Sequence, residues 1–157
     1  AVAKREILIQ TPNLNEPIMV AALLAAAKGG VRVDVVLSKN FEDGTEALPG
    51  RGGTNDDTVE YIYEEMAGYA DACDRFRVRW YSEDGQTPVT INGPPNSHLK
   101  FMAVDGEVVI VGSSNHDVQS WHNSRELMVV ADDPVTVEAW SSVYTFDSAV
   151  PTALCGR

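Results

Sequence analysis

The sequence predicts an α/β fold, a sandwich in which helices flank a mixed β-sheet. Between residues 6 and 82, short apolar strand-like runs alternate with longer helical segments, which is the pattern of parallel β-α-β units. Two further apolar runs flank Asp105-Gly106, a dipeptide typical of tight hairpin turns, so an antiparallel pair should join the same sheet. With 157 residues, of which 44% are hydrophobic, the chain should form one domain.

The first β-α-β unit is predicted over residues 6–37. Residues 6–10 form a short apolar run, and Pro17 can open a helix over residues 18–28 because its fixed φ suits the first helical turn. Gly29-Gly30 then ends the helix, and the β-branched run 31–37 predicts the second strand. A right-handed crossover should make the two strands parallel neighbours.

The later elements are predicted from turn residues, capping residues and apolar periodicity in the same way. Residues 39–55 and 83–97 should be loops because they are rich in Gly, Pro, Asn or acidic residues. A helix capped by Asp56 or Asp57 should continue to about Cys73. The remaining expected elements are a strand over 76–82, the hairpin, a strand over 127–131 and a closing helix over 134–147.

The most informative stretch is residues 98–115, HLKFMAVDGEVVIVGSSN. Strand side chains alternate between faces, so His98 and Lys100 should share one face of the first hairpin strand. The turn returns the second strand, which should bring Ser113 and Asn115, also of equal parity, close to His98. An imidazole, an ammonium, a hydroxyl and an amide at one end of a sheet are the groups needed to bind and attack a phosphate.

This stretch resembles the signature of the phospholipase D superfamily, H-x-K-x₄-D-x₆-G-S-x-N, the HKD motif. All six fixed positions match, namely His98, Lys100, Asp105, Gly112, Ser113 and Asn115. Residues 123–126, NSRE, resemble the segment in which that family places an acidic partner for its histidine. The resemblance implies a phospholipase D-like α/β sandwich, with residues 1–157 forming a single half-domain that carries one HKD motif.

The resemblance further implies phosphodiester cleavage without a metal or other cofactor. In that family one histidine attacks phosphorus to form a phosphohistidine, and a histidine from a second motif protonates the leaving oxygen. His98 would be the nucleophile or the general acid. Lys100 would supply fixed positive charge, while Ser113 and Asn115 would donate to the phosphate oxygens. Glu126 would hold His98 Nδ1 so that Nε2 faces the phosphate.

The other two matched positions are expected to be structural. Asp105 has the parity opposite to His98 and Lys100, and it occupies a position in the hairpin turn. It should therefore not take part directly in the chemistry. Gly112 belongs to the motif as a structural residue.

A second motif must come from elsewhere. Of the three histidines, neither His116 nor His122 is followed two residues later by lysine, so the chain holds one motif where the chemistry needs two. Either two copies form a homodimer, or the chain is one half of a longer enzyme. The first residue is Ala1 and not Met, which fits a chain that was processed or cut from a longer protein.

The expected substrate is a phospholipid or another phosphodiester. A formal charge of −11 disfavours nonspecific attraction to nucleic acid or to anionic membranes, so nucleic acid is the less favoured substrate. Trp121 could line a pocket for acyl chains or a base, or pack in the core. The alternatives are a small homodimeric nuclease of the same superfamily and an inactive half-domain that serves as an interaction module.

No metal site is predicted. The candidate ligands would be His98, His116, His122, Asp117 and Glu126, but no short pair such as H-x-x-x-H anchors them.

The composition leaves the compartment open. The longest apolar run, residues 18–27, is too short to cross a bilayer, so a soluble or peripheral membrane protein is expected. Cys73 and Cys155 could form one disulfide or remain two free thiols.

Overall fold

The structure, a computed structural model, describes residues 3–90 and 96–152. Part of the predicted loop 83–97 and Cys155 lie outside these residues, whereas Cys73 is disulfide-bonded. The strands are β1 (Glu6–Thr11), β2 (Arg32–Leu37), β3 (Phe76–Trp80), β4 (Phe101–Val104), β5 (Val108–Gly112), β6 (Met128–Ala131) and β7 (Val150–Pro151). The helices are α1 (Pro17–Lys28), α2 (Asp43–Glu46), α3 (Asn55–Met66), α4 (Ala72–Arg75), α5 (Val118–Asn123), α6 (Pro134–Ser141) and the 3₁₀ turn η1 (Phe146–Ser148).

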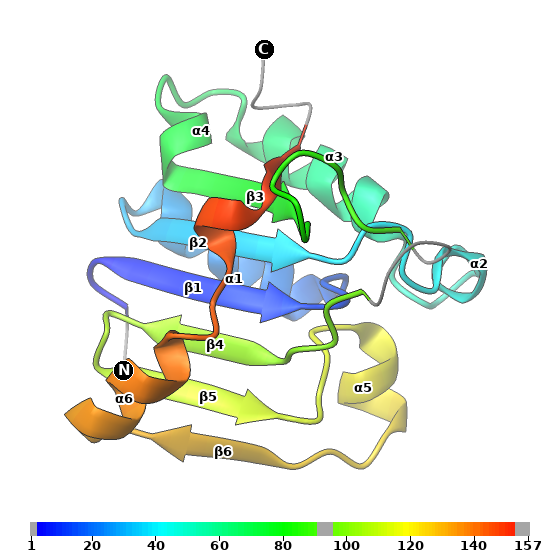
Figure 1. The fold of residues 1–157 in the computed structure, drawn as a ribbon. Helices are drawn as coiled ribbons and strands as arrows, with labels where there is room; N and C mark the ends of the chain where they lie inside the picture. The colour runs from blue at the N-terminus through cyan, green and yellow to red at the C-terminus, as the bar shows by residue number, and fades with distance from the viewer. Residues whose placement is uncertain (1–2, 91–95, 153–157) are drawn as a thin grey trace.

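Within the described residues the strands form one seven-stranded sheet in the order β6-β5-β4-β1-β2-β3-β7 (Figure 1). β1, β2 and β3 are parallel, and the other pairings are antiparallel. The predicted mixed α/β sheet is therefore confirmed. The first strand of the sequence lies at the centre of the sheet, between the parallel half and the antiparallel half.

The parallel half forms where the sequence alternates strand and helix signals. The Glu16 carboxylate caps α1 by accepting from the Met19 N–H at 2.8 Å, and Pro17 occupies the first helical turn. Gly30 follows the helix with a φ of 95°, a conformation that glycine adopts without strain. The helix buries Val20, Leu23, Leu24 and Ala27 against the sheet.

The antiparallel half is a hairpin with one further strand. Asp105 and Gly106 both have positive φ, and the Glu107 N–H donates to the Val104 carbonyl at 3.0 Å, as in a type I′ turn. Val104 pairs with Val108, so the loop contains three residues and not the expected two. β4 lies antiparallel to β1, with Phe101 opposite Gln10 at one end of the pair.

Several element boundaries differ from the prediction. Thr54, and not Asp56 or Asp57, caps α3, because its hydroxyl and the Asp57 carboxylate form a reciprocal capping box. This helix ends at Met66, and the separate α4 follows before β3. The predicted loop 39–55 contains α2, the unpredicted α5 follows the motif, and α6 ends at Ser141.

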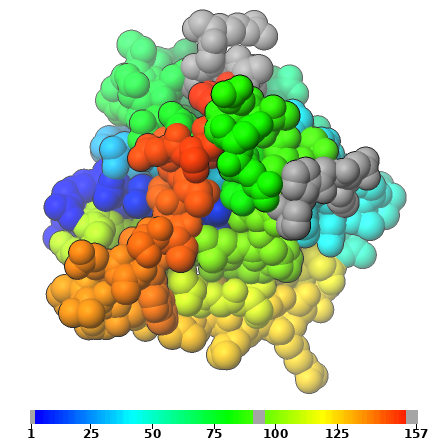
Figure 2. Space-filling view, in the orientation of Figure 1, coloured from blue at the N-terminus to red at the C-terminus, as the bar shows by residue number. Residues whose placement is uncertain are grey.

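Helices cover both faces of the sheet. α1 and α3 pack together on one face, and the core there includes residues of β1, β2 and β3. On the other face, α6 packs against β5, and the chain that follows it continues over the sheet to η1 and β7 (Figures 1 and 2). In the described ranges 3–90 and 96–152, no helix has the length and apolar character needed to cross a membrane.

Candidate active site

The matched motif residues other than Asp105 lie at the edge of the sheet where β1 ends. β4 begins beside the end of β1, and the residues before it, His98 and Lys100, therefore lie at this edge. β5 ends at the same edge, where the Gly112 N–H donates to the Lys100 carbonyl at 3.3 Å. Glu126 reaches the edge from the segment before β6. The topology thus brings together side chains that are up to 28 positions apart in the sequence (98 to 126).

His98 lies at the surface of this edge. Its side chain is exposed on one side, and its ring centroid lies 5.6 Å from that of Phe41. Desolvation by neighbouring protein atoms, followed by the positive charge of Lys100, lowers the pKa of His98, while Glu42 opposes this shift. A lower pKa favours the neutral imidazole, which is the form that can attack phosphorus.

Lys100 is buried beside His98, with only 8% of the residue exposed. Its Nζ donates to the His98 carbonyl at 3.0 Å. Burial lowers the pKa of Lys100, and the carboxylates of Asp117, Glu126 and Glu42 oppose this shift. β4 begins only at Phe101, so the expected strand alternation does not determine the orientation of His98 and Lys100.

Ser113 and Glu126 bind each other. The Ser113 hydroxyl donates to Glu126 Oε2 and accepts from the Leu127 N–H at 3.0 Å. Across the described residues, the Glu126 carboxylate makes no hydrogen bond to His98. In this structure, therefore, the Ser113 hydroxyl proton is engaged by Glu126, and the expected Glu126 to His98 Nδ1 contact is not formed.

Asn115 is held by a residue that sequence reasoning considered only as a metal ligand. Its Nδ2 donates to Asp117 Oδ2 at 2.9 Å, and its Oδ1 is buried without a hydrogen-bond partner in the described part of the chain. Asp117 also caps α5 by accepting from the Ser120 N–H at 2.6 Å. An acidic residue directly before a helix is a typical N-cap, and this pattern could have indicated the role of Asp117, but the sequence did not predict α5.

The loop that carries Asn115 is fixed to the loop between β1 and α1. The His116 carbonyl accepts from the N–H groups of Asn15 and Glu16 at 3.0 and 3.1 Å, and the His116 N–H donates to the Asn13 carbonyl at 3.2 Å. The Asn15 side chain accepts from the Val118 N–H at 3.0 Å. These bonds leave the polypeptide between the motif and α5 little freedom, so the position of Asn115 is well defined.

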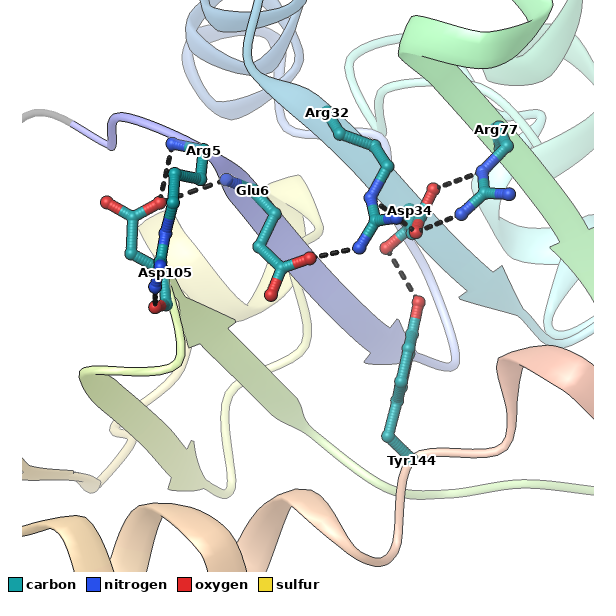
Figure 3. A network of polar contacts seen from close by, with 7 residues as sticks. All are labelled: Arg5, Glu6, Arg32, Asp34, Arg77, Asp105 and Tyr144. Carbon is teal, nitrogen blue, oxygen red and sulfur yellow. Dashed lines mark hydrogen bonds and ion pairs between the residues drawn. The ribbon is translucent and has the colours of Figure 1, made fainter.

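Asp105 lies beside Arg5 and Glu6 at the start of β1 (Figure 3), whereas His98 precedes the β4 residues that pair with the end of β1. Its carboxylate accepts from the backbone N–H groups of Lys4, Arg5 and Glu6 at 2.8, 2.7 and 2.9 Å. These bonds lower the pKa of Asp105, with the bond from Glu6 contributing most. Its contacts are those of a residue that ties the hairpin turn to the start of β1.

Gly112 allows β5 and β6 to approach closely. A Cβ atom at this position would lie 2.2 Å from the Leu127 carbonyl oxygen and 2.5 Å from Met128 Sδ. The Ser113 N–H donates to the same Leu127 carbonyl at 3.0 Å. A glycine is therefore needed where Ser113 and Glu126 meet.

An apolar cavity of about 490 Å³ borders the motif residues. Its polar lining residues include Ser114, which follows Ser113 in the sequence, and Glu126, which binds the Ser113 hydroxyl. His116 also contributes to its wall, although its ring nitrogens are buried. The apolar lining residues are Met19, Met102, Ile110, Trp121 and Met128.

The residues weighed as candidate metal ligands, for which no metal site was predicted, do not converge. His122 Nε2 lies 3.3 Å from Glu16 Oε1, and the buried His116 ring has no hydrogen-bond partner among the described residues. Within residues 3–90 and 96–152, no group of three or more His, Cys, Asp or Glu side chains is arranged to hold a metal ion.

Comparison with known families and proteins identifies similar chains. A family model described as "Cardiolipin synthase, PLD-like domain" matches residues 1–146. Mitochondrial cardiolipin hydrolase from Xenopus laevis is 25% identical over 144 residues, covering 90% of this chain and 54% of that protein. The chain therefore spans about half the length of this relative.

Two solved structures have a similar fold. The phospholipase D family member Nuc from Salmonella typhimurium gives a TM-score of 0.69 at 22% identity, covering 96% of this chain and 83% of that one. Phosphatidylserine synthase from Haemophilus influenzae gives a TM-score of 0.69 at 14% identity, covering 98% of this chain and 35% of that one. At these identities the likeness concerns the arrangement of the sheet and helices.

Proposed function

Because this chain belongs to the family of phospholipase D-like domains described for cardiolipin synthase, we propose that it is one half of a phosphodiesterase or phosphatidyltransferase. The observation that carries the proposal is the convergence of His98, Lys100 and Asn115 at one edge of the sheet. A nucleophile, a buried cation and an amide donor are then available to one phosphate group.

In the proposed reaction, His98 Nε2 forms a bond to phosphorus while the bond from phosphorus to the leaving oxygen breaks. The histidine of the second motif gives its proton to that oxygen. Water or an alcohol then attacks the phosphohistidine, returns a proton to the second histidine and releases His98. If this chain represents the other half of the site, His98 has the acid and base role.

The solvent exposure of the site residues supports the presence of a second half of the active site. His98, Ser113 and Glu126 are all exposed, so this edge alone would not exclude water from a bound phosphate. A second copy of the chain, or the rest of a longer protein, would supply the second imidazole and cover these residues. A single imidazole cannot attack phosphorus and protonate the opposite leaving group in one step.

The surroundings of the site favour a phospholipid over nucleic acid. The cavity beside Glu126 is lined by three methionines, Ile110 and Trp121, which suit hydrocarbon better than a charged polymer. The net charge of −11 opposes nonspecific attraction to nucleic acid and to anionic membranes alike, so the preference rests on the cavity and not on the charge. The name of the cardiolipin hydrolase relative agrees with a lipid substrate.

Competition between water and an alcohol tests the covalent mechanism. With cardiolipin vesicles and increasing ethanol, product should shift from phosphatidic acid to phosphatidylethanol, while total turnover changes little, because both acceptors resolve the same intermediate. The enzyme should be assayed with its second motif present, as the dimer or the full-length protein. His98→Ala should abolish both products.

Two results would contradict this proposal. If only phosphatidic acid forms at high ethanol concentration, water attacks directly and His98 does not carry a phosphoryl group. If cardiolipin is untouched but DNA is cut, with activity that falls steeply as salt rises, the protein is a nuclease of the same superfamily.

A further inference from the structure

Asp117 is buried at the point where the motif loop meets α5, with 2% of the residue exposed. One carboxylate oxygen accepts from Asn115 Nδ2 at 2.9 Å, and the other accepts from the Ser120 N–H at 2.6 Å. A single carboxylate therefore links the amide of the motif to the first turn of the following helix. The helix cap alone would explain an acidic residue here, but it would not explain the bond to Asn115.

We propose that Asp117 is a positioning residue of this site, which orients the Asn115 amide toward the bound phosphate. The inference rests on the proposed function, since it assigns Asp117 a task in phosphate binding. It adds a residue outside the six matched motif positions. Asp117 acts through Asn115 and does not touch the substrate.

The two ends of the Asn115 amide differ in what they can bind. An amide has an oxygen that accepts and a nitrogen that donates, and only the nitrogen can donate to a phosphate oxygen. A carboxylate accepts hydrogen bonds and donates none, so it selects the Nδ2 end of Asn115. One Nδ2 hydrogen then binds Asp117, and the second remains for the phosphate. An uncharged partner with both donor and acceptor atoms would lose this selection.

The negative charge of Asp117 also acts on the Lys100 ammonium. Four charged or titratable groups act on its ammonium, namely the imidazole of His98 and the carboxylates of Asp117, Glu126 and Glu42. Glu126 and Glu42 are exposed, so water and salt screen them, whereas Asp117 is buried. Asp117 is also the largest of the charges that raise the pKa of Lys100. It therefore helps a buried lysine to remain protonated.

Asp117→Asn is the informative substitution, because asparagine is as good a helix cap as aspartate and has nearly the same shape. Asp133→Asn is the matched control, since Asp133 caps α6 by accepting from the Thr136 N–H at 3.0 Å and lies outside the site. Asp117→Ser keeps a capping oxygen and serves as a second variant should the asparagine variant not fold.

Two readouts separate positioning from a structural role. Nuclear magnetic resonance should follow the side-chain amide of Asn115 and the ammonium of Lys100 during titrations with pH and with inorganic phosphate. In Asp117→Asn the Lys100 pKa should be lower than in the wild type, because a negative charge is lost. Phosphate affinity should fall at least roughly 10-fold, the size of one hydrogen bond to a charged group. The alkaline limb of the kcat/KM profile should move to lower pH.

The outcomes are decisive. If Asp117→Asn and Asp133→Asn lose similar stability, and the Lys100 pKa and the phosphate affinity stay as in the wild type, Asp117 is only a helix cap and the inference is wrong. If the wild-type protein turns over no phosphodiester, the proposed function fails. The Lys100 titration and the Asn115 amide signals still decide the role of Asp117 in that case.

Discussion

At the residue scale, His116 is a buried titratable group in an apolar environment. The residue is 5% exposed, and neither ring nitrogen has a hydrogen-bond partner in the described part of the chain. Burial lowers the pKa of His116 to about 4, and the neighbouring Asp117 opposes the shift only in part. The imidazole is therefore neutral in the folded protein at pH 7, as a residue that packs beside an apolar cavity should be.

This environment predicts a loss of stability in mild acid. The unfolded chain binds a proton at His116 near its ordinary pKa of 6.5, whereas the folded chain does so only near 4. Between these values the unfolded state holds more protons, so the free energy of unfolding should fall as the pH decreases, by about 3 kcal/mol for a shift of this size. Urea titrations at several pH values measure this fall.

A non-titrating ring isolates the contribution of His116. His116→Phe should flatten the pH dependence of the free energy of unfolding between pH 6.5 and 4, because phenylalanine binds no proton in either state. An equally steep dependence in His116→Phe would mean that other groups cause the acid destabilisation.

At the element scale, the close approach of β5 and β6 fixes two site residues at once. Gly112 pairs with Met128, and the Leu127 carbonyl lies where a side chain on Gly112 would be. Ser113 directly follows β5 and Glu126 lies two residues before β6, so their hydrogen bond depends on the spacing of these two strands. A change at Gly112 should therefore affect both stability and the site.

Gly112→Ala should destabilise the protein by roughly 1–3 kcal/mol and reduce turnover, because its methyl group would overlap backbone atoms of β6. Gly44→Ala is the matched control, since a Cβ there meets no atom within 4 Å. Thermal unfolding and the phosphodiester assay test the pair. Equal stability and activity of the two variants would show that β6 moves aside without cost.

The sequence predicts some elements better than others for physical reasons. α1 and β2 were predicted within one residue, since Pro17 and Gly29 mark the helix ends and apolar runs lie between them. α5 has six residues, too few to show a helical periodicity, and was missed. The start of α3 was misplaced because Thr54 and Asp57 form a capping box that competes with a cap at Asp56.

The contacts of the site likewise divide into those that the sequence predicts and those that it does not. The motif spacing predicted that His98 and Ser113–Asn115 would meet at one edge, because a tight turn fixes how two strands return. It could not predict that Glu126 binds Ser113 or that Asp117 binds Asn115. Those contacts depend on the path of the loops between β5 and β6, and loop conformation is set by tertiary contacts that no local pattern records.

At the scale of the whole molecule, one motif per chain predicts that activity depends on pairs of chains. We expect wild-type protein mixed and re-equilibrated with His98→Ala to lose activity as the square of the wild-type fraction, since a mixed dimer holds one imidazole. An equal mixture should keep about one quarter of the full activity. Turnover measured across a series of mixtures gives the dependence.

The alternative architecture gives a different curve. If both motifs belong to one longer chain, activity should follow the wild-type fraction linearly, and a homodimeric site would be ruled out. Analytical ultracentrifugation of the same mixtures checks that the dimers have exchanged subunits. Circular dichroism of His98→Ala checks that the variant is folded, as expected for an exposed side chain that precedes β4.

The central position of β1 also has a consequence during protein synthesis. Its neighbour β2 follows within the next 26 residues of chain (11 to 37), but its other neighbour, β4, ends at residue 104. At typical elongation rates the ribosome needs roughly 5–20 s to make the intervening segment, and during that time one edge of β1 has no strand to pair with. The hairpin of β4 and β5 is local and can form as soon as it emerges, so its docking should cover the free edge of β1 before β6 and β7 join the sheet. The nascent chain is therefore most exposed to strand-to-strand aggregation just before the motif that carries His98 leaves the ribosome.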